Sequence, residues 1–238
     1  MDNCKPVYDR ILLKLSGEAI SKKESIINFE YIEEIAKTVK KCQMEGVQIA
    51  LLVGAGNIWR GRSGECMDRV KADHMGMLAT CINAIAIQET FLRCGVDSVV
   101  MSPIEMKPFV KPYVRDDAIR FLKEGKVVIF GGGLGIPYVS TDTAAVVRAA
   151  EINANTVLMA KNIDAIYTSD PKKDPNAKKI KSITYKEVLA KGLAAMDSTA
   201  TSFAMDNNIS IHVFGLDNCE NIYKVIMGSD MGTIVKGE

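Results

Sequence analysis

Three glycine-rich turns, each following a short apolar run, hold the groups best suited to chemistry. The longest stretch, residues 127–150, passes from Val-Val-Ile-Phe into four glycines between Gly131 and Gly135, then through Ser140-Thr-Asp-Thr143 into an alanine-rich segment. Glycines leave backbone N–H groups uncovered, and the start of a helix adds unpaired donors and a positive dipole end. This turn is therefore predicted to cradle a phosphate.

The other two turns each bring a cation. The apolar run at residues 11–15 places Lys14 directly before Ser16-Gly17, and the run at residues 49–53 leads to Arg60. An ammonium buried in an apolar strand costs on the order of several kcal/mol unless an anion meets it. An edge strand that points Lys14 into solvent is the alternative, but ligands of parallel sheets collect at the carboxyl ends of strands. Lys14 and the planar fork of Arg60 are predicted to stabilise a transferring phosphoryl group.

Carboxylates at predicted helix starts have two interpretations each. Asp142 could cap its helix, yet the two hydroxyl residues before it can cap equally well, and a carboxylate beside a phosphate cradle repels the ligand. It makes sense if it orients Lys14 or helps to hold magnesium between phosphates. Asp73 caps a long helix or meets a sugar hydroxyl, and Asp197 is more simply an N-cap.

Short apolar runs alternate with helical patterns along the chain, which predicts βαβ units and a largely parallel sheet. Strands are expected at residues 10–15, 48–53, 98–101, 126–130, 156–159, 210–214 and 233–235. Helices are expected at residues 30–45, 73–93, 116–124, 142–152, 186–190, 198–207 and 220–227. The polar stretch 168–182 is predicted to be a solvated surface loop. Because no linker separates two halves, we expect a single α/β domain over residues 1–238.

Composition argues against several classes of protein. Of the 238 residues, 47% are hydrophobic and 25% charged, and a net charge of +1 with 6% aromatic residues gives no reason to expect a nucleic-acid partner. The six cysteines form no CxxC pair, which favours free thiols in a reducing cytosol over a zinc cluster. No apolar run approaches the ~20 residues that span a bilayer. A cytoplasmic protein without a membrane partner is expected.

Six collinear segments make the chain similar, over nearly its whole length, to the bacterial-type uridylate kinases of the amino-acid-kinase superfamily. They are Lys14-Leu-Ser-Gly-Glu-Ala19, Gly54-Ala-Gly-Asn-Ile-Trp-Arg-Gly61, Asp73-His-Met-Gly-Met-Leu-Ala-Thr80, Ser140-Thr-Asp-Thr-Ala-Ala145, Asp164-Ala-Ile-Tyr-Thr-Ser-Asp-Pro171 and Met196-Asp-Ser-Thr-Ala200. The segment that begins at Asp73 separates uridylate kinases from the carboxylate kinases of the superfamily. The resemblance implies a three-layer αβα sandwich around a largely parallel central sheet.

The resemblance also implies transfer of the γ-phosphoryl group of ATP to UMP, with magnesium held mainly through the ATP phosphates. The implied catalytic residues are Lys14, Arg60 and Asp142. The implied ATP-binding residues are Lys14, Leu15, Ser16, Gly17, Gly56, Arg60, Asn162, Tyr167 and Asp170. The implied UMP-binding residues are Ala55, Asp73 (on the ribose), Leu134, Gly135, Ile136, Pro137, Tyr138, Val139, Ser140 and Thr141. Family members are hexamers, with the 73–93 region as the expected contact. The N-terminal half would serve mainly UMP and this contact, and residues from about 155 to 238 mainly ATP.

The chain departs from the family pattern at three places. Ala55 replaces the middle glycine of a Gly-Gly-Gly-Asn turn, and residues 21–27 replace a glycine-rich loop tied to GTP activation in some members. Leu134 and Ile136 replace a threonine and an asparagine near UMP, and aliphatic side chains neither donate nor accept hydrogen bonds. Two alternatives therefore stay open: a carboxylate or amino-acid kinase of the same superfamily, and a catalytically weak, nucleotide-sensing regulator.

Overall fold

A nine-stranded sheet forms the centre of the molecule. The computed structural model describes residues 5–59, 67–169, 171, 173–193 and 196–237. The strands lie in the order β4-β3-β5-β2-β1-β6-β10-β11-β9; β10 and β11 are antiparallel and the other neighbouring pairs are parallel. Their bounds are β1 (Arg10–Leu15), β2 (Gln48–Val53), β3 (Ser98–Ser102), β4 (Lys111–Pro112), β5 (Val127–Phe130), β6 (Thr156–Lys161), β9 (Ser182–Thr184), β10 (Ser210–Gly215) and β11 (Thr233–Lys236). The sheet therefore joins strands from both halves of the chain.

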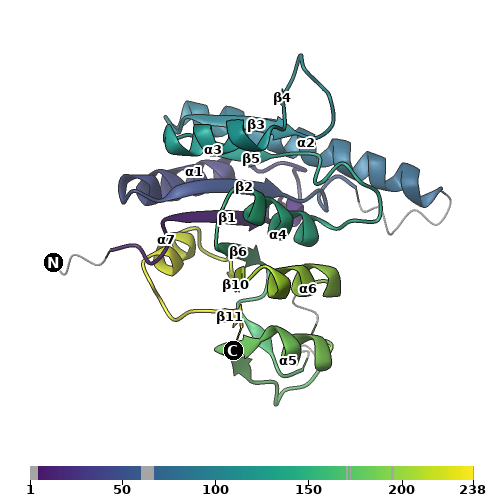
Figure 1. Cartoon of the computed structure of the whole chain (residues 1–238), viewed down its shortest axis with the longest axis vertical. Helices are drawn as coiled ribbons and strands as arrows, with labels where there is room; N and C mark the ends of the chain where they lie inside the picture. The colour runs from purple at the N-terminus through teal and green to yellow at the C-terminus, as the bar shows by residue number, and fades with distance from the viewer. Residues whose placement is uncertain (1–4, 60–66, 170, 172, 194–195, 238) are drawn as a thin grey trace.

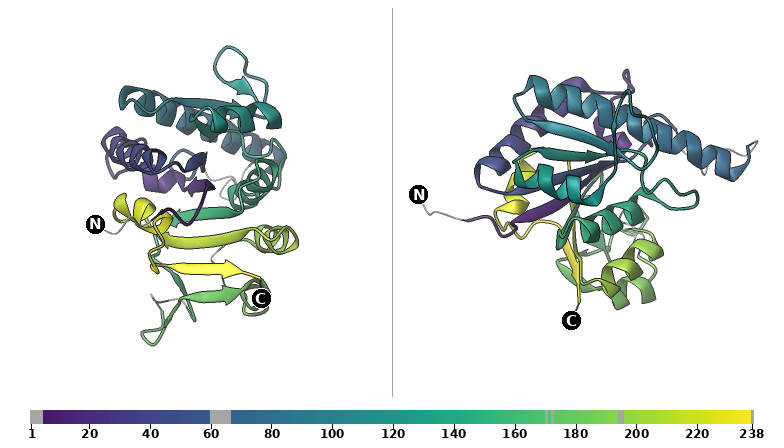
Figure 2. Two further views of the ribbon diagram at one scale, coloured as in Figure 1. Left: turned by 60° about the vertical axis from the view of Figure 1, so that its left-hand side comes forward. Right: turned by 45° about the horizontal axis from the view of Figure 1, so that its top comes forward.

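Helices cover both faces of this sheet, as Figures 1 and 2 show, and confirm the three-layer αβα fold. One face carries α1 (Phe29–Met44), α2 (Arg69–Arg93) and α7 (Glu220–Ile226). The other carries α3 (Arg115–Lys123), α4 (Thr141–Glu151), α5 (Tyr185–Ala190) and α6 (Ser198–Asp206). A short 3-10 helix, η1 (Gly17–Ile20), follows β1.

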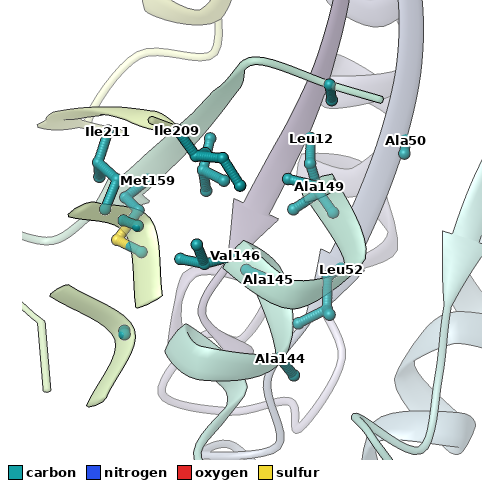
Figure 3. Packing of buried hydrophobic residues seen from close by; sticks show 14 of the residues in the cluster. Leu12, Ala50, Leu52, Ala144, Ala145, Val146, Ala149, Met159, Ile209 and Ile211 are labelled. Carbon is teal, nitrogen blue, oxygen red and sulfur yellow. The ribbon is translucent and has the colours of Figure 1, made fainter. Parts of the chain in front are cut away.

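Strand β1 lies in the middle of the sheet, between β2 and β6, so the edge-strand interpretation of Lys14 is wrong. Alternation along the strand sends Leu13 to the face of α1 and α7 and Leu12 to the face of α4. Lys14 shares the face of Leu12 by the same alternation. Figure 3 shows Ala145 and Ala149 of α4 on the same side of the sheet as Leu12 and Leu52. Small side chains let α4 approach the sheet closely, which brings its first turn near the end of β1.

Most predicted elements match, but α2 begins earlier than expected. It starts at Arg69 and is capped by Asp68, whose side chain accepts a hydrogen bond from the Lys71 amide at 3.1 Å. Asp73 therefore does not cap this helix. Asp68 has the residue type of a good N-cap, but Arg69 and Lys71 make the first turn polar, so the apolar pattern predicts a later start.

The polar stretch 168–182 is not loop throughout. Its C-terminal part contains β8 (Lys179–Ile180), which pairs with β7 (Ile166–Tyr167) in a small antiparallel sheet, and Ser182 begins β9. Short strands at an edge have little apolar alternation, because most of their side chains meet solvent. The composition therefore did not predict β7 and β8, and it did not predict β4 for the same reason.

Helix α2 is the one described helix that is long and apolar enough to cross a membrane by length and composition. The expectation that no stretch comes near this length was therefore too strong. Half of its most apolar window is buried inside the protein, where α2 packs on α1 and β3. A core helix of a soluble protein passes the same test, so this is weak evidence for a membrane.

The cysteines within the described residues are free thiols, as predicted. Cys42, Cys81 and Cys219 are buried. Burial raises the pKa of the Cys42 thiol to about 12 and, with smaller contributions, that of Cys219 to about 11. Thiols with such pKa values carry almost no thiolate at neutral pH and are poor nucleophiles.

Candidate active site

Two lysines share one carboxylate at the carboxyl ends of the central strands. The Lys14 Nζ lies 2.7 Å from Asp142 Oδ1, and the Lys161 Nζ lies 3.2 Å from Asp142 Oδ2. Lys14 is 6% exposed and is the last residue but one of β1, whereas Lys161 ends the neighbouring β6. Ser140, not Asp142, caps α4 by accepting a hydrogen bond from the Thr143 amide at 3.0 Å. Asp142 is thus free of a capping role, and its carboxylate contacts both lysines.

Burial and charge act in opposite directions on these groups. Burial by itself would raise the pKa of Asp142, but the ammonium groups of Lys14 and Lys161 outweigh it and hold the pKa below its ordinary value. Burial lowers the pKa of Lys161, and Asp142 offsets part of this change. A carboxylate held ionised between two cations is a poor proton acceptor, so Asp142 is suited to positioning the lysines and not to acting as a base.

A cavity of about 240 Å³ opens beside this cluster. Seven of the ten residues expected at UMP line it: Ala55, Asp73, Leu134, Ile136, Val139, Ser140 and Thr141. Gly56, expected at the ATP phosphates, lines the same cavity, while Gly135, Pro137 and Tyr138 do not. Gly132 and Gly133 of the predicted phosphate-binding turn also line it, and four residues that were not predicted at the site complete the wall: Trp59, Gly76, Met77 and Thr80.

The glycine loop after β5 has fewer free amides than its composition suggested. The Gly131 amide donates to the Met101 carbonyl, the Gly132 amide to Thr80 Oγ1 and the Gly135 amide to the Gly132 carbonyl. Within the described part of the chain, only the Gly133 and Leu134 amides of this loop lack a protein acceptor. Both of these residues line the cavity. The loop therefore offers two N–H groups to an anion, and not five.

Helix α2 holds both glycine turns from one side. Thr80 accepts from the Gly132 amide at 2.7 Å, and the buried Asn83 donates to the Gly54 carbonyl at 2.8 Å. Asn83 also exchanges hydrogen bonds with Asn57, at 2.8 and 3.0 Å. About two turns before Thr80 in the same helix, Asp73 Oδ2 accepts from the Tyr138 amide at 2.8 Å. These side chains project from one helix, and their targets are far apart in sequence, so composition gave no signal of them.

A second cavity, of about 420 Å³, lies past the end of β6. Tyr167, expected to bind adenosine, lines it together with Ile163, Ala165 and Leu193. Asn162, also expected there, is an exposed residue directly before Ile163. The Tyr167 hydroxyl donates to Asp164 Oδ1 at 2.8 Å, and Asp164 in turn pairs with Lys179 of β8.

Two predicted site residues, Arg60 and Asp170, lie outside the described residues. Leu15, Ser16 and Gly17 lie where expected, at the turn that follows Lys14. A side chain at Gly17 would come within 2.7 Å of the Gly56 amide nitrogen, so the two turns touch and glycine is required there. The side chain of Asp197 caps α6 as predicted, accepting from the Ala200 amide at 2.8 Å.

Comparisons with known proteins agree with this geometry. The model of the amino acid kinase family matches residues 9–215. UMP kinase from Bacillus anthracis is 34% identical with a TM-score of 0.93 over 97% of each chain, and UMP kinase from Ureaplasma parvum is 35% identical with a TM-score of 0.91 over 96% of this chain and 99% of that one. Uridylate kinase from Archaeoglobus fulgidus is 25% identical, with a TM-score of 0.76 over 94% of this chain and 99% of that one. The chain therefore belongs to the amino acid kinase family. The predicted resemblance to bacterial-type UMP kinases is confirmed.

Proposed function

We propose that this protein is a uridylate kinase that transfers the γ-phosphoryl group of ATP to UMP, giving UDP and ADP. The observation that carries the proposal is that the cluster of two lysines on Asp142 adjoins, along the chain, residues that line two different cavities. Asp142 directly follows Thr141, which lines the first cavity, and Lys161 lies two residues before Ile163, which lines the second. Two fixed ammonium groups between two nucleotide sites can neutralise the charge of a phosphoryl group in transfer.

The reaction needs no general base. A UMP phosphate oxygen, already ionised near neutral pH, forms the new bond to the γ-phosphorus of ATP, while the bond from that phosphorus to the β–γ bridging oxygen breaks. The electron pair of the broken bond stays on ADP, whose growing negative charge a cation must stabilise. Lys14 is placed for that task, and Asp142 keeps both ammonium groups in position. The low pKa of Asp142 is in keeping with this role.

The first cavity is assigned to UMP and the second to the adenosine part of ATP. In this assignment Asp73 meets the ribose, the 134–141 segment follows the nucleotide, and the Gly133 and Leu134 amides face its phosphate. The turn from Lys14 to Gly17, with Gly56 and Arg60, holds the ATP phosphates; Asn162, Tyr167 and Asp170 hold adenosine. The support is that seven of the ten residues expected to bind UMP line the first cavity, and that Tyr167 lines the second.

Magnesium is proposed to arrive with ATP as part of the substrate. Among the described residues, no group of three histidine, cysteine, aspartate or glutamate side chains could hold a metal ion. Asp142 is already committed to two ammonium groups. Because the described residues offer no such group, the ATP phosphates themselves would hold the ion beside Lys14.

The proposal also includes a cytoplasmic location, a role in pyrimidine nucleotide synthesis and assembly as a homo-oligomer, which is a hexamer by the family pattern. The assembly is supported by an apolar row on the outer face of α2: Met75, Leu78, Ile82, Ile85 and Leu92 are between 39% and 52% exposed. Their spacing of three, four, three and seven residues places them along one side of the helix. A contiguous exposed row of this kind is typical of an interface between protein subunits.

A coupled assay of ADP formation tests the activity. The enzyme is offered ATP and magnesium with UMP, CMP, aspartate, glutamate or carbamate in separate reactions. UMP-dependent formation of ADP and UDP is the expected result. Turnover of a carboxylate or carbamate in place of UMP would overturn the proposal in favour of the other branch of the superfamily. Binding of UMP without any turnover would indicate the nucleotide-sensing regulator.

A further inference from the structure

Arg148 is a buried cation on α4 that the phosphoryl-transfer chemistry does not use. It is 4% exposed, and its guanidinium lies 3.7 Å from the centre of the Tyr113 ring. Its Nη1 donates to Glu151 Oε2 at 2.6 Å, and its Nη2 donates to the Gly133 carbonyl oxygen at 3.3 Å. Burying an arginine is costly unless its donors are used. Here one of the donors is directed at the glycine loop.

The contact with Gly133 fixes a whole peptide unit. The carbonyl oxygen of Gly133 and the N–H of Leu134 belong to the same planar trans unit, in which they point in opposite directions. When Arg148 holds the oxygen toward the core, the Leu134 N–H turns away from the core, on the side of the cavity that Leu134 lines. The positive guanidinium next to the oxygen also polarises the amide and makes its N–H a stronger donor.

The loop needs such a restraint because its backbone is free to rotate. Gly133 has φ of +57°, a conformation that favours glycine, and a side chain added to it would meet no neighbouring atom within 4 Å. Packing therefore does not hold this peptide. Thr80 restrains the preceding amide, that of Gly132, from the opposite side of the loop. The peptide that carries the Gly133 N–H is restrained in turn by its Gly132 carbonyl, which accepts from the Gly135 amide, and Arg148 restrains the peptide that carries the Leu134 N–H.

One donor of Arg148 is left unsatisfied in this arrangement. Its Nε has no hydrogen-bond partner although it is buried, so the guanidinium is not placed to satisfy its own donors best. An ion pair with Glu151 alone could form at the surface, where Glu151 is 35% exposed. The burial of Arg148 is explained if its guanidinium must reach the Gly133 carbonyl.

We propose that Arg148 positions the phosphate-binding loop: it holds the Gly133–Leu134 peptide so that the Leu134 N–H, beside that of Gly133, faces the phosphate of the acceptor nucleotide. Arg148 does not touch the nucleotide in this arrangement and acts through the peptide. The proposal rests on UMP being the acceptor, as argued above. It makes Arg148 a determinant of phosphate recognition and leaves recognition of the nucleoside part to other residues.

Calorimetric titration of Arg148→Lys with UMP and with uridine tests this. Lysine keeps the charge but lacks the planar fork that reaches Glu151 and Gly133 together. The Kd for UMP is expected to rise about tenfold or more, as for one weakened hydrogen bond to a charged group, while the Kd for uridine changes less than about twofold. Arg120→Lys is the matched control, because Arg120 also lies over an aromatic ring and pairs with two carboxylates, but on the exposed side of α3.

Each outcome is decisive when circular dichroism shows a folded variant. An equal loss of UMP and uridine affinity would mean that Arg148 only supports the cavity as a whole, and unchanged UMP affinity would remove it from phosphate recognition; either overturns the proposal. Failure of the wild-type protein to bind UMP would count against the proposed function instead.

Hydrogen–deuterium exchange on the wild-type protein gives a test that needs no folded variant. UMP is expected to slow exchange of the Gly133 and Leu134 amides, and uridine is expected to leave them unchanged. Equal protection by both ligands, or by neither, would show that these amides do not face the phosphate and would overturn the role of Arg148.

Discussion

At the scale of single residues, the decisive feature is a carboxylate shared by two ammonium groups. Asp142 contacts Lys14 from β1 and Lys161 from β6, which are neighbouring parallel strands. Each lysine lies at the end of its strand, where a parallel sheet collects charged ligands. The cluster therefore concentrates positive charge where phosphoryl transfer is proposed, while Asp142 keeps the two cations from repelling each other out of place.

Lys14→Ala is expected to lower kcat by about 10²–10³-fold, as is common when a transition-state electrostatic donor is removed. UMP binding should change little, because Lys14 is assigned to the ATP side. Steady-state kinetics and calorimetry measure the two effects. Lys181→Ala is the control, since Lys181 pairs with Asp230 on the exposed surface. A folded Lys14→Ala protein with activity within a few-fold of wild type would remove Lys14 from the mechanism.

Asp142→Asn is expected to lower the free energy of unfolding by about 3 kcal/mol at pH 7, because it leaves two largely buried ammonium groups without their carboxylate. The pKa of Asp142 is lowered in the folded state, so its contribution is complete above the ordinary value of 3.8 and is lost as the pH falls through the lowered pKa. Urea unfolding of both proteins should therefore give a constant difference between pH 7 and pH 5. A difference that disappears within that window would contradict the ion cluster.

At the scale of elements, α2 has a polar side that holds two glycine turns and an apolar side that faces solvent. Thr80 and Asn83 belong to the first side, and Ile82 and Ile85 to the second. Neighbouring positions on a helix point in directions about 100° apart, so one segment can serve both tasks. A subunit interface on α2 would therefore involve the same helix that positions the two glycine turns.

Ile82→Glu is expected to dissociate the proposed oligomer, since a charge at the centre of an apolar contact must be desolvated without a partner. Ile82 is 52% exposed in the single chain, so the substitution should not harm the fold itself. Light scattering after size-exclusion chromatography measures the mass. Met44→Glu, at an 81% exposed site on α1, is the matched control and should leave the mass unchanged. An unchanged mass for Ile82→Glu would place the interface elsewhere.

At the scale of the whole molecule, the sheet buries a histidine that ties its C-terminal strands together. The His212 Nε2 donates to the Met231 carbonyl at 2.7 Å, and its Nδ1 is buried without a partner. Burial lowers the pKa of His212, and the bond to Met231 offsets only part of this effect. The folded state therefore resists protonation that the unfolded chain accepts.

Stability is accordingly expected to fall as the pH drops below 6.5, the ordinary pKa of histidine, because the unfolded state then binds the extra proton. His212→Gln should lose less stability than the wild type between pH 7.5 and pH 5.5. Thermal unfolding at a series of pH values measures this, with His74→Gln at an exposed site as the control. A parallel pH dependence of wild type and His212→Gln would show that His212 is not the titrating group.

The sequence by itself determined the alternation of strands and helices, the three glycine turns and the resemblance to one kinase family. The resemblance rests on six collinear segments. The alternation and the turns follow instead from short-range causes: side-chain periodicity of 2 or 3.6 residues, the freedom of glycine and the capping preferences of helix starts. They were enough to place Lys14 and Asp142 as candidates. They failed for the start of α2 and for β8, where the local pattern was ambiguous or polar.

Only the tertiary structure decided which distant groups meet. Strand order places Lys161 beside Asp142. The packing of α4 brings Arg148 into contact with Gly133, and Thr80 of α2 accepts a hydrogen bond from the Gly132 amide. Thr80 and Gly132 are 52 positions apart along the chain, so no local pattern relates them. Side-chain periodicity tells which face of an element a residue occupies, but the neighbour across that face depends on how the sheet is ordered and how closely each helix packs.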